Sequence, residues 1–239
     1  MTTYCNSNRA AMPDLFEDIE LVIFDFDGVI ADSEVISLAT LRSALGSFGI
    51  DLTLEDTRKK FLGTSLETIE AYVRTHGTGN RKDFGSFWET TLFDRFQVEL
   101  KPMPLVTHLL EKLDGVGLKY CIASSGTLER IGVALDAMKL RQRFEHVFSA
   151  QQVARGKPEP DLFLHAAREI GIRPEVCLVI EDSPFGVRAA KAAGMRCAGF
   201  TGGSHVSDVE TEHGDLLRRN GAEVIWSTYE DLFPHILAK

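Results

Sequence analysis

Two aspartates separated by one residue follow an apolar run near the start of the chain. The run Leu21–Phe24 leads directly into Asp25, and Asp27 and Gly28 follow after one further residue. Two neighbouring carboxylates can share nucleophilic attack and proton transfer, and their oxygens are the ligands that hard cations such as Mg²⁺ prefer. Asp and Gly also dominate ordinary turns, so this motif alone leaves a purely structural turn open. Polar residues later in the chain separate the two interpretations.

Other polar residues follow three later apolar runs. These residues are Ser124, Ser125 and Gly126 after 118–123, Lys157 after 145–149, and Glu181 and Asp182 after 177–180. Together with Asp25 and Asp27, they make a set of four acids, a hydroxyl turn and one lysine. Acids that hold a hard cation, with a serine and a lysine that bind phosphate, suit metal-assisted phosphoryl transfer. The sequence therefore favours a catalytic site over a structural turn.

Strand-like and helix-like segments alternate over most of the chain. Short apolar, β-branched runs predict strands at 21–26, 118–123, 145–149, 177–180, 195–200 and 222–226. Amphipathic segments predict helices at 105–113, 128–138, 160–170, 185–193 and 208–219. Such alternation implies right-handed crossovers and a parallel sheet covered on both faces. We therefore expect an α/β fold with a Rossmann-like parallel-sheet core, in which the strand ends bring the polar residues to one crevice.

One region interrupts the alternation with helical patterns alone, which cover 36–48, 54–60, 66–75 and 83–96. We expect an inserted α-helical cap domain at 35–100, a catalytic core at 19–34 and 101–239, and a loose extension at 1–18. An insert that leaves the sheet where ligands bind is placed to cover the site. Trp88, Phe84 and Phe87 fall at helical spacing and are expected in the core of this cap.

Composition and charge narrow the function classes. The chain has 239 residues, with 26 Lys and Arg against 35 Asp and Glu, a formal net charge of −9 and a mean hydropathy of −0.05. An acidic chain argues against a nucleic-acid partner, because phosphate-backbone contacts need clustered Lys and Arg. No apolar run approaches the ~20 residues of a membrane span, and neither a secretory signal nor a C-x-x-C pair is present. We therefore expect a cytoplasmic protein that binds a small molecule, with no nucleic-acid or membrane partner.

Taken together, the motifs resemble the haloacid dehalogenase superfamily, and most closely its phosphatase and phosphomutase branch with a helical cap. All four motifs, beginning at Asp25, Ser124, Lys157 and Glu181, occur in order, and the resemblance covers nearly the whole chain. It implies an Mg²⁺-dependent hydrolase of a small phosphorylated metabolite. Receiver domains of signalling proteins combine similar residues, but they are much shorter and have no cap. A phospho-Asp signalling module is therefore the less favoured alternative.

The resemblance also implies a role for each motif residue. Asp25 would be the nucleophile that becomes an aspartyl phosphate, and Asp27 would be the general acid and then the general base. The residues that would bind the transferring phosphoryl group are Ser124, Ser125, Gly126 and Lys157. The residues that would hold Mg²⁺ are Asp25, Asp27 through its main-chain carbonyl, Glu181 and Asp182. A carboxylate repels an anionic phosphate, so the cation and the lysine must first neutralise charge.

A phosphomutase of the β-phosphoglucomutase type shares these motifs and is the alternative activity. It must hold a second phosphate at the cap, which requires cationic or hydrogen-bonding groups there. The cap loop that we expect to set specificity consists of Leu62, Gly63, Thr64, Ser65 and Leu66. In the mutase pattern a Lys precedes the loop glycine and an Arg follows three residues later, whereas both positions are leucine here. The stretch 32–36 and the serine turn look more like sugar-phosphate phosphatases such as 6-phosphogluconate phosphatase, and we expect a phosphatase that acts on a sugar phosphate.

Overall fold

Six parallel strands form one sheet in this computed structural model, which describes residues 17–61, 64 and 66–237. The strands are β1 (Leu21–Phe24), β2 (Lys119–Ser124), β3 (Val147–Ser149), β4 (Cys177–Glu181), β5 (Arg196–Phe200) and β6 (Val224–Trp226). Their order across the sheet is β3-β2-β1-β4-β5-β6. Each predicted strand is present, and the expected α/β fold is confirmed. The extension expected at 1–18 lies almost entirely outside the described residues.

Strand β1 lies at the centre of the sheet, between β2 and β4. All four of its side chains are buried, as expected for a strand covered on both faces of a parallel sheet. Val22 and Phe24 pack into one core, whereas Leu21 and Ile23 pack into the other, because successive side chains of a strand point to opposite faces. The carboxyl ends of the three central strands therefore meet at one edge of a rigid, buried sheet.

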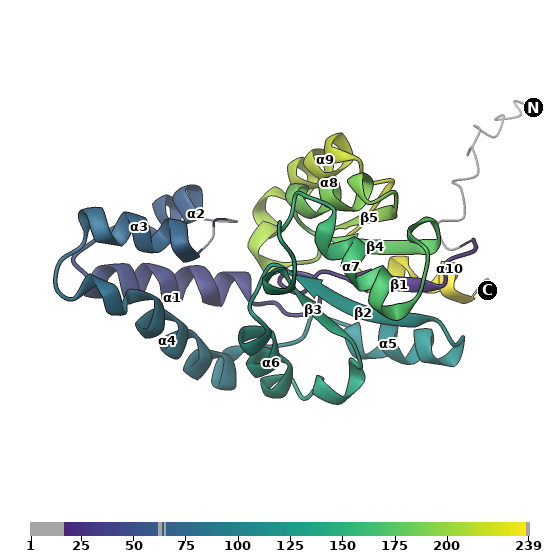
Figure 1. Cartoon of the computed structure of the whole chain (residues 1–239), viewed down its shortest axis with the longest axis horizontal. Helices are drawn as coiled ribbons and strands as arrows, with labels where there is room; N and C mark the ends of the chain where they lie inside the picture. Colours follow the sequence, from purple (N-terminus) through teal and green to yellow (C-terminus); the bar gives the residue numbers. More distant parts are fainter. Residues whose placement is uncertain (1–16, 62–63, 65, 238–239) are drawn as a thin grey trace, which may run out of the picture.

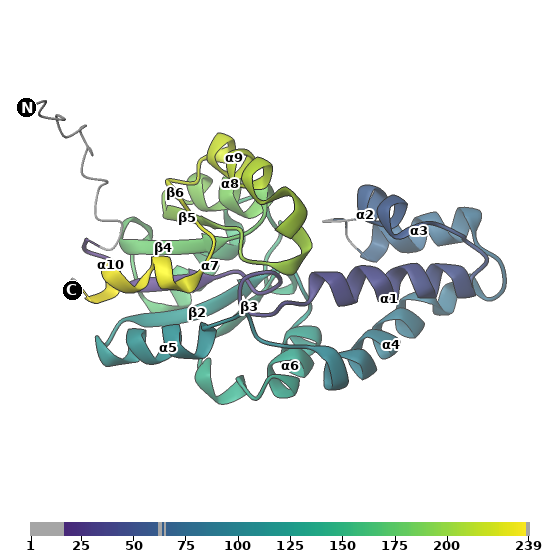
Figure 2. The same cartoon turned by 180° about the vertical axis from the view of Figure 1, so that it is seen from behind.

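Helices cover both faces of this sheet (Figures 1 and 2). One face packs against α5 (Val106–Gly115), α6 (Leu128–Ala137) and α10 (Phe233–Leu237), and the other against α7 (Asp161–Ile170), α8 (Pro184–Ala192) and α9 (Glu210–Asn220). Each fully buried Leu or Ile side chain in these layers contributes about 1.5–3 kcal/mol to folding. Among the described residues, no helix combines the length and the apolar character needed to span a membrane.

Strand β1 ends at Phe24, two residues before the end of the segment 21–26 that is predicted as a strand. The carbonyl of Phe26 accepts hydrogen bonds from the amides of Ile30 and Ala31, both at 2.9 Å, so the chain turns at this point. Gly28 has a φ of 78°, which glycine adopts without the steric cost that other residues meet. The turn leaves Asp25 directly after the strand end and carries Asp27 away from it.

The insert between β1 and β2 contains four α-helices in its described part. They are α1 (Glu34–Ser47), α2 (Leu54–Phe61), α3 (Leu66–His76) and α4 (Phe84–Glu99). Figure 1 shows them extending from one end of the sheet. Arg58 of α2 donates a hydrogen bond of 2.7 Å to the carbonyl of His205, which joins the insert to the core.

The aromatic residues of α4 differ in burial. Phe84 and Trp88 are buried, as expected. Phe87 is 43% exposed, so the expectation that it packs in the core of the insert is wrong. Phe84 and Trp88 lie four residues apart and share one face of the helix, whereas Phe87 is rotated from Trp88 by about 100°. Its ring instead makes an edge contact with Phe48 at 5.7 Å between centroids.

Candidate active site

Asp25 lies at the carboxyl end of β1, at the edge of the sheet where the polar motifs meet. Its amide donates a hydrogen bond of 2.9 Å to the carbonyl of Ile180, which ties it to β4. Lys157 Nζ lies 2.5 Å from Asp25 Oδ1 and 2.6 Å from Glu181 Oε1. The strand order brings the motif that follows β4 beside Asp25, and the loop before α7 supplies the lysine that bridges them.

Three buried carboxylates gather next to this lysine. Ligand oxygens of Asp25, Glu181 and Asp182 all lie within 4.8 Å of one another. An all-oxygen set of this kind fits a hard cation such as Mg²⁺, which takes few carboxylates and retains several waters. Lys157 by itself does not balance three carboxylates, so a divalent cation would complete the charge of the cluster. The side chains predicted to ligate a metal through their carboxylates are thus close enough to share one ion.

Burial and mutual repulsion shift the pKa values in this cluster. Burial raises the pKa of Asp25, Lys157 opposes that rise, and the charges of Glu181 and Asp182 add to it. Burial also raises the pKa of Asp182, and the charge of Glu181 raises it further. Burial alone would lower the pKa of Lys157, but the carboxylates of Asp25 and Glu181 outweigh that effect and raise it. The lysine is therefore charged at neutral pH, and the carboxylates gain from an additional cation.

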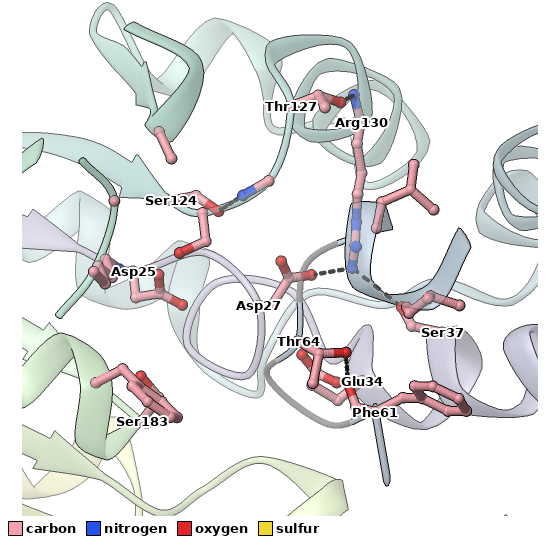
Figure 3. A pocket seen from close by; sticks show the side chains of 18 of the residues that line it. Asp25, Asp27, Glu34, Ser37, Phe61, Thr64, Ser124, Thr127, Arg130 and Ser183 are labelled. Atoms are coloured by element: carbon pink, nitrogen blue, oxygen red, sulfur yellow. Dashed lines mark hydrogen bonds and ion pairs between the residues drawn. The ribbon is translucent and has the colours of Figure 1, made fainter. Parts of the chain in front are cut away.

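Ser124, Ser125 and Gly126 form a turn at the end of β2. Ser124 is buried, and its Oγ accepts a hydrogen bond of 3.0 Å from the amide of Gly126. Ser149, at the end of β3, donates a hydrogen bond of 2.6 Å to the carbonyl of Gly126, so the neighbouring strand supports the turn. The three turn residues, Ser124 to Gly126, line a cavity of about 520 Å³ together with Lys157 (Figure 3). The same cavity contains the acidic cluster. The predicted phosphate-binding residues therefore share one cavity.

Asp27 faces the same cavity and points toward α6 (Figure 3). Arg130 Nη2 lies 2.9 Å from Asp27 Oδ1 and 3.1 Å from Ser37 Oγ. The hydroxyl of Ser33 also donates to Asp27 Oδ1. Both contacts hold the same carboxylate oxygen and so set the orientation of the group. The Asp27 side chain thus stands apart from the three carboxylates that could share a metal.

The predicted cap loop falls partly within the described residues. Leu62, Gly63 and Ser65 lie outside them. Thr64 and Leu66 line the cavity, and the hydroxyl of Thr64 donates a hydrogen bond of 2.9 Å to the carbonyl of Phe61. The expectation that this loop faces the catalytic crevice thus rests here on Thr64 and Leu66. Its effect on specificity stays a prediction.

Comparison with known proteins identifies the family. Residues 22–200 match the model of the haloacid dehalogenase-like hydrolases. The chain belongs to this family. The 6-phosphogluconate phosphatase of Escherichia coli is 29% identical to it over 190 residues, which cover 78% of this chain and 85% of that protein. The fructose-1-phosphate phosphatase YqaB of Escherichia coli is 30% identical over 189 residues, or 76% of this chain and 96% of that protein.

A solved structure extends the likeness to the fold. The haloacid dehalogenase family hydrolase of Deinococcus radiodurans, with bound phosphate and sodium, has a TM-score of 0.72 and 30% identity, over 90% of this chain and 93% of that one. The resemblance that the motifs indicate is therefore confirmed. The chain is a haloacid dehalogenase-like hydrolase, an enzyme of the phosphatase kind, with a buried acidic triad that could hold a metal ion.

Sequence reasoning overlooked the basic side of this hydrolase's site. Arg130 lies in the first turn of α6, where its amide donates to the Thr127 side chain at 3.1 Å. A cation in the first turn of a helix opposes the helix dipole, and this unfavourable position is the signal that could have marked it. Ser33 and Ser37 also reach the site, but serines near a helix start are too common to be selected from sequence.

The turn at Gly28 leaves no room for a side chain beside the acidic cluster. A Cβ there would lie 2.0 Å from Asp182 Oδ2, and the φ of 78° is left-handed. Gly28→Ala should therefore displace the Asp182 carboxylate or the turn, at a cost of about 1–2 kcal/mol from the left-handed backbone alone. We expect a lower Tm and a rise of at least about tenfold in the metal concentration for half-maximal activity.

A matched control for this substitution lies on α1. Gly46 has open space around it, so Gly46→Ala should leave both the metal requirement and the activity as they are. Thermal unfolding and a metal titration of activity measure the two effects. A Gly28→Ala protein with the wild-type metal requirement would show that the turn does not position Asp182.

Proposed function

We propose that this hydrolase is an Mg²⁺-dependent phosphatase that hydrolyses a small phosphorylated metabolite, a sugar phosphate, through an aspartyl-phosphate intermediate. The observation that carries the proposal is the position of Asp25. It lines the cavity, lies 2.5 Å from a buried lysine and shares a potential metal site with Glu181 and Asp182. The names of two relatives, both phosphatases of small phosphorylated metabolites, support that general class of substrate, and the fructose-1-phosphate phosphatase supports a sugar phosphate. The phosphate in the Deinococcus structure supports the ligand.

The first half-reaction transfers the phosphoryl group to Asp25. A carboxylate oxygen of Asp25 attacks phosphorus, and the bond between phosphorus and the leaving oxygen breaks. Asp27 donates a proton to that oxygen, a transfer worth about 10²–10⁴-fold in rate. Lys157 and Ser124 bind oxygens of the transferring group. Mg²⁺ held by Asp25, Glu181 and Asp182 would offset the negative charge of the phosphate.

The second half-reaction releases inorganic phosphate. Asp27, now ionised, removes a proton from a water molecule, and that water attacks the phosphorus of the aspartyl phosphate. The bond between phosphorus and the Asp25 oxygen breaks, which regenerates the carboxylate. Arg130 and Ser33 fix Asp27 Oδ1, so the same carboxyl group is oriented for both proton transfers. We also propose that 35–100 is the cap that covers this reaction and that 19–34 with 101–239 is the catalytic core.

Net hydrolysis distinguishes this proposal from a phosphomutase. Among the described residues that line the cavity, the cations are Lys157 and Arg130, and each is paired with an aspartate of the core. A second phosphate at the insert would therefore meet mainly apolar and acidic side chains, because the hydroxyls of Ser37 and Thr64 that also line the cavity donate to backbone carbonyls. We expect inorganic phosphate as the product and little conversion of β-glucose 1-phosphate to glucose 6-phosphate, even with a bisphosphate activator.

A phosphate-release screen over phosphorylated sugars, nucleotides and acids with Mg²⁺ tests the proposal. At least one sugar phosphate should give a kcat/KM of about 10⁴ M⁻¹s⁻¹ or more, the lower end of the usual enzyme range. The same preparation without substrate and the Asp25→Asn protein are the controls for contaminating phosphatase. Efficient isomerisation of β-glucose 1-phosphate, or no release from any monoester, would overturn the proposal.

A further inference from the structure

The half of the cavity beside the insert is acidic. Glu34 from α1 and Glu89 from α4 line this half together with Asp27. Among the described residues that line it, Arg130 is the cation that faces these groups, and it forms an ion pair with Asp27 at 2.9 Å. Neither glutamate comes within ion-pair distance of Arg130. The guanidinium of Arg130 therefore faces three acidic side chains, and it already forms an ion pair with Asp27, the acid that the mechanism uses.

Burial and neighbouring negative charges raise the pKa values of both glutamates. Burial raises the pKa of Glu34 to about 7, the charge of Asp27 adds to the rise, and Arg130 opposes it. Burial also raises the pKa of Glu89, with a contribution from the charge of Glu129, and Arg130 again opposes it. The two groups therefore already lie in surroundings that disfavour negative charge. Another anion placed beside them would meet the same penalty.

The remaining walls of this half suit the carbon skeleton of a sugar. Trp88, which is 8% exposed, lines the cavity together with Phe61 and Leu92. Aromatic side chains offer a large apolar surface for C–H groups, and carboxylates accept hydrogen bonds from hydroxyl groups. The volume of about 520 Å³ falls within the ~300–1,000 Å³ of small-molecule sites and exceeds what a phosphate alone occupies. A polyhydroxylated leaving group would use both kinds of wall.

We propose that this half of the cavity selects phosphate esters of neutral polyhydroxylated compounds, with Glu34 and Glu89 as the specificity-determining residues. It rejects esters whose leaving group carries a carboxylate or a second phosphate. The inference rests on the proposed phosphatase activity. A neutral polyol donates hydroxyl hydrogens to the glutamates and adds no charge. An anionic leaving group places one more negative charge beside Asp27, Glu34 and Glu89, in surroundings that already disfavour negative charge, and the paired Arg130 cannot offset it fully.

Substrate pairs that share a carbon skeleton and differ by one charged group test the selection. Sorbitol 6-phosphate and 6-phosphogluconate share a linear skeleton and differ by a terminal hydroxymethyl or carboxylate. Fructose 1-phosphate and fructose 1,6-bisphosphate differ by a second phosphate. We expect kcat/KM to favour the neutral member of each pair by at least about tenfold, the order expected for a repulsion between partly buried charges. p-Nitrophenyl phosphate reports phosphatase activity independently of the leaving-group selection.

Charge-removing variants assign the selection to the two residues. Glu89→Gln should lower the preference about fivefold, and the double variant with Glu34→Gln should lower it further, mainly through a higher kcat/KM for the anionic members. Glutamine keeps the size and a hydrogen-bond acceptor, so turnover of the neutral members should change less. Glu67→Gln, on the exposed face of α3, removes the same charge away from the cavity and should leave the preference unchanged.

The possible outcomes separate the two proposals. No phosphate release from any ester, p-nitrophenyl phosphate included, would overturn the proposed function. Release from p-nitrophenyl phosphate with equal or higher kcat/KM for the anionic members would overturn the selection alone. Hydrolysis of neither neutral member, or a preference that persists in the double variant, would also overturn the assignment to Glu34 and Glu89.

Discussion

Asp25→Asn is expected to reduce kcat by at least about 10³-fold, because the substitution removes the attacking oxygen while the side-chain volume stays the same. The fold should persist, since Lys157 keeps its ion pair with Glu181 at 2.6 Å. Loss of one of three crowded carboxylates also relieves repulsion, because the charges of Glu181 and Asp182 add to the rise that burial causes in the pKa of Asp25, against the opposing charge of Lys157. Phosphate release measures the first effect, and thermal unfolding measures the second.

A covalent readout makes the test specific to the nucleophile. Wild-type protein mixed rapidly with a ³²P-labelled substrate and quenched in acid should carry label, whereas the Asp25→Asn protein should carry none. Asp51→Asn, at an exposed position in the insert, is the matched control and should behave as wild type in every measurement. More than a few per cent of wild-type kcat in Asp25→Asn would exclude Asp25 as the nucleophile.

Removal of divalent cations with EDTA should stop phosphate release, and Mg²⁺ should restore it. Ligand oxygens of Asp25, Glu181 and Asp182 lie within 4.8 Å of one another, and Lys157 is the lysine that pairs with them in the described part of the chain. An anionic phosphate would therefore be repelled without a further cation. A ligand that binds only the folded protein also stabilises it, so the Tm should rise with Mg²⁺ concentration. Undiminished turnover in metal-free buffer would contradict the mechanism.

Two variants divide the metal-binding and acid–base roles. Asp182→Asn removes a ligand from the triad and should raise the Mg²⁺ concentration for half-maximal activity at least about tenfold, with a matching loss of the Mg²⁺-dependent rise in Tm. Asp27→Asn should lower kcat severely, because it removes the proton donor, yet it should retain the Mg²⁺-dependent rise in Tm. Its predicted metal contact is the main-chain carbonyl, which the substitution keeps. An equal loss of metal affinity in both variants would show this division of roles to be wrong.

The core half of the site could be predicted from the sequence because its residues follow strands. Runs such as Leu21–Phe24 are recognisable from local composition, and the carboxyl ends of parallel strands share one edge. Asp25, Ser124 and Glu181 could therefore be expected near one another without any knowledge of strand order. The error at Phe87 arose on a helix. Helical spacing marks a face of the helix, but it does not say how much of that face is packed.

The half of the cavity beside the insert could not be predicted, because its walls come from helices that are far apart in the sequence and pack together only in the fold. Whether Arg130 reaches Asp27 depends on how α6 is rotated against the turn that follows β1, and no local pattern determines that rotation. The same holds for Glu34 and Glu89, which line one cavity only because α1 and α4 pack side by side. The sequence by itself determined which polar residues gather at the edge of the sheet, since strand ends set their positions locally. The tertiary structure decided which charges face the part of the cavity beside the insert, because those positions depend on helix packing.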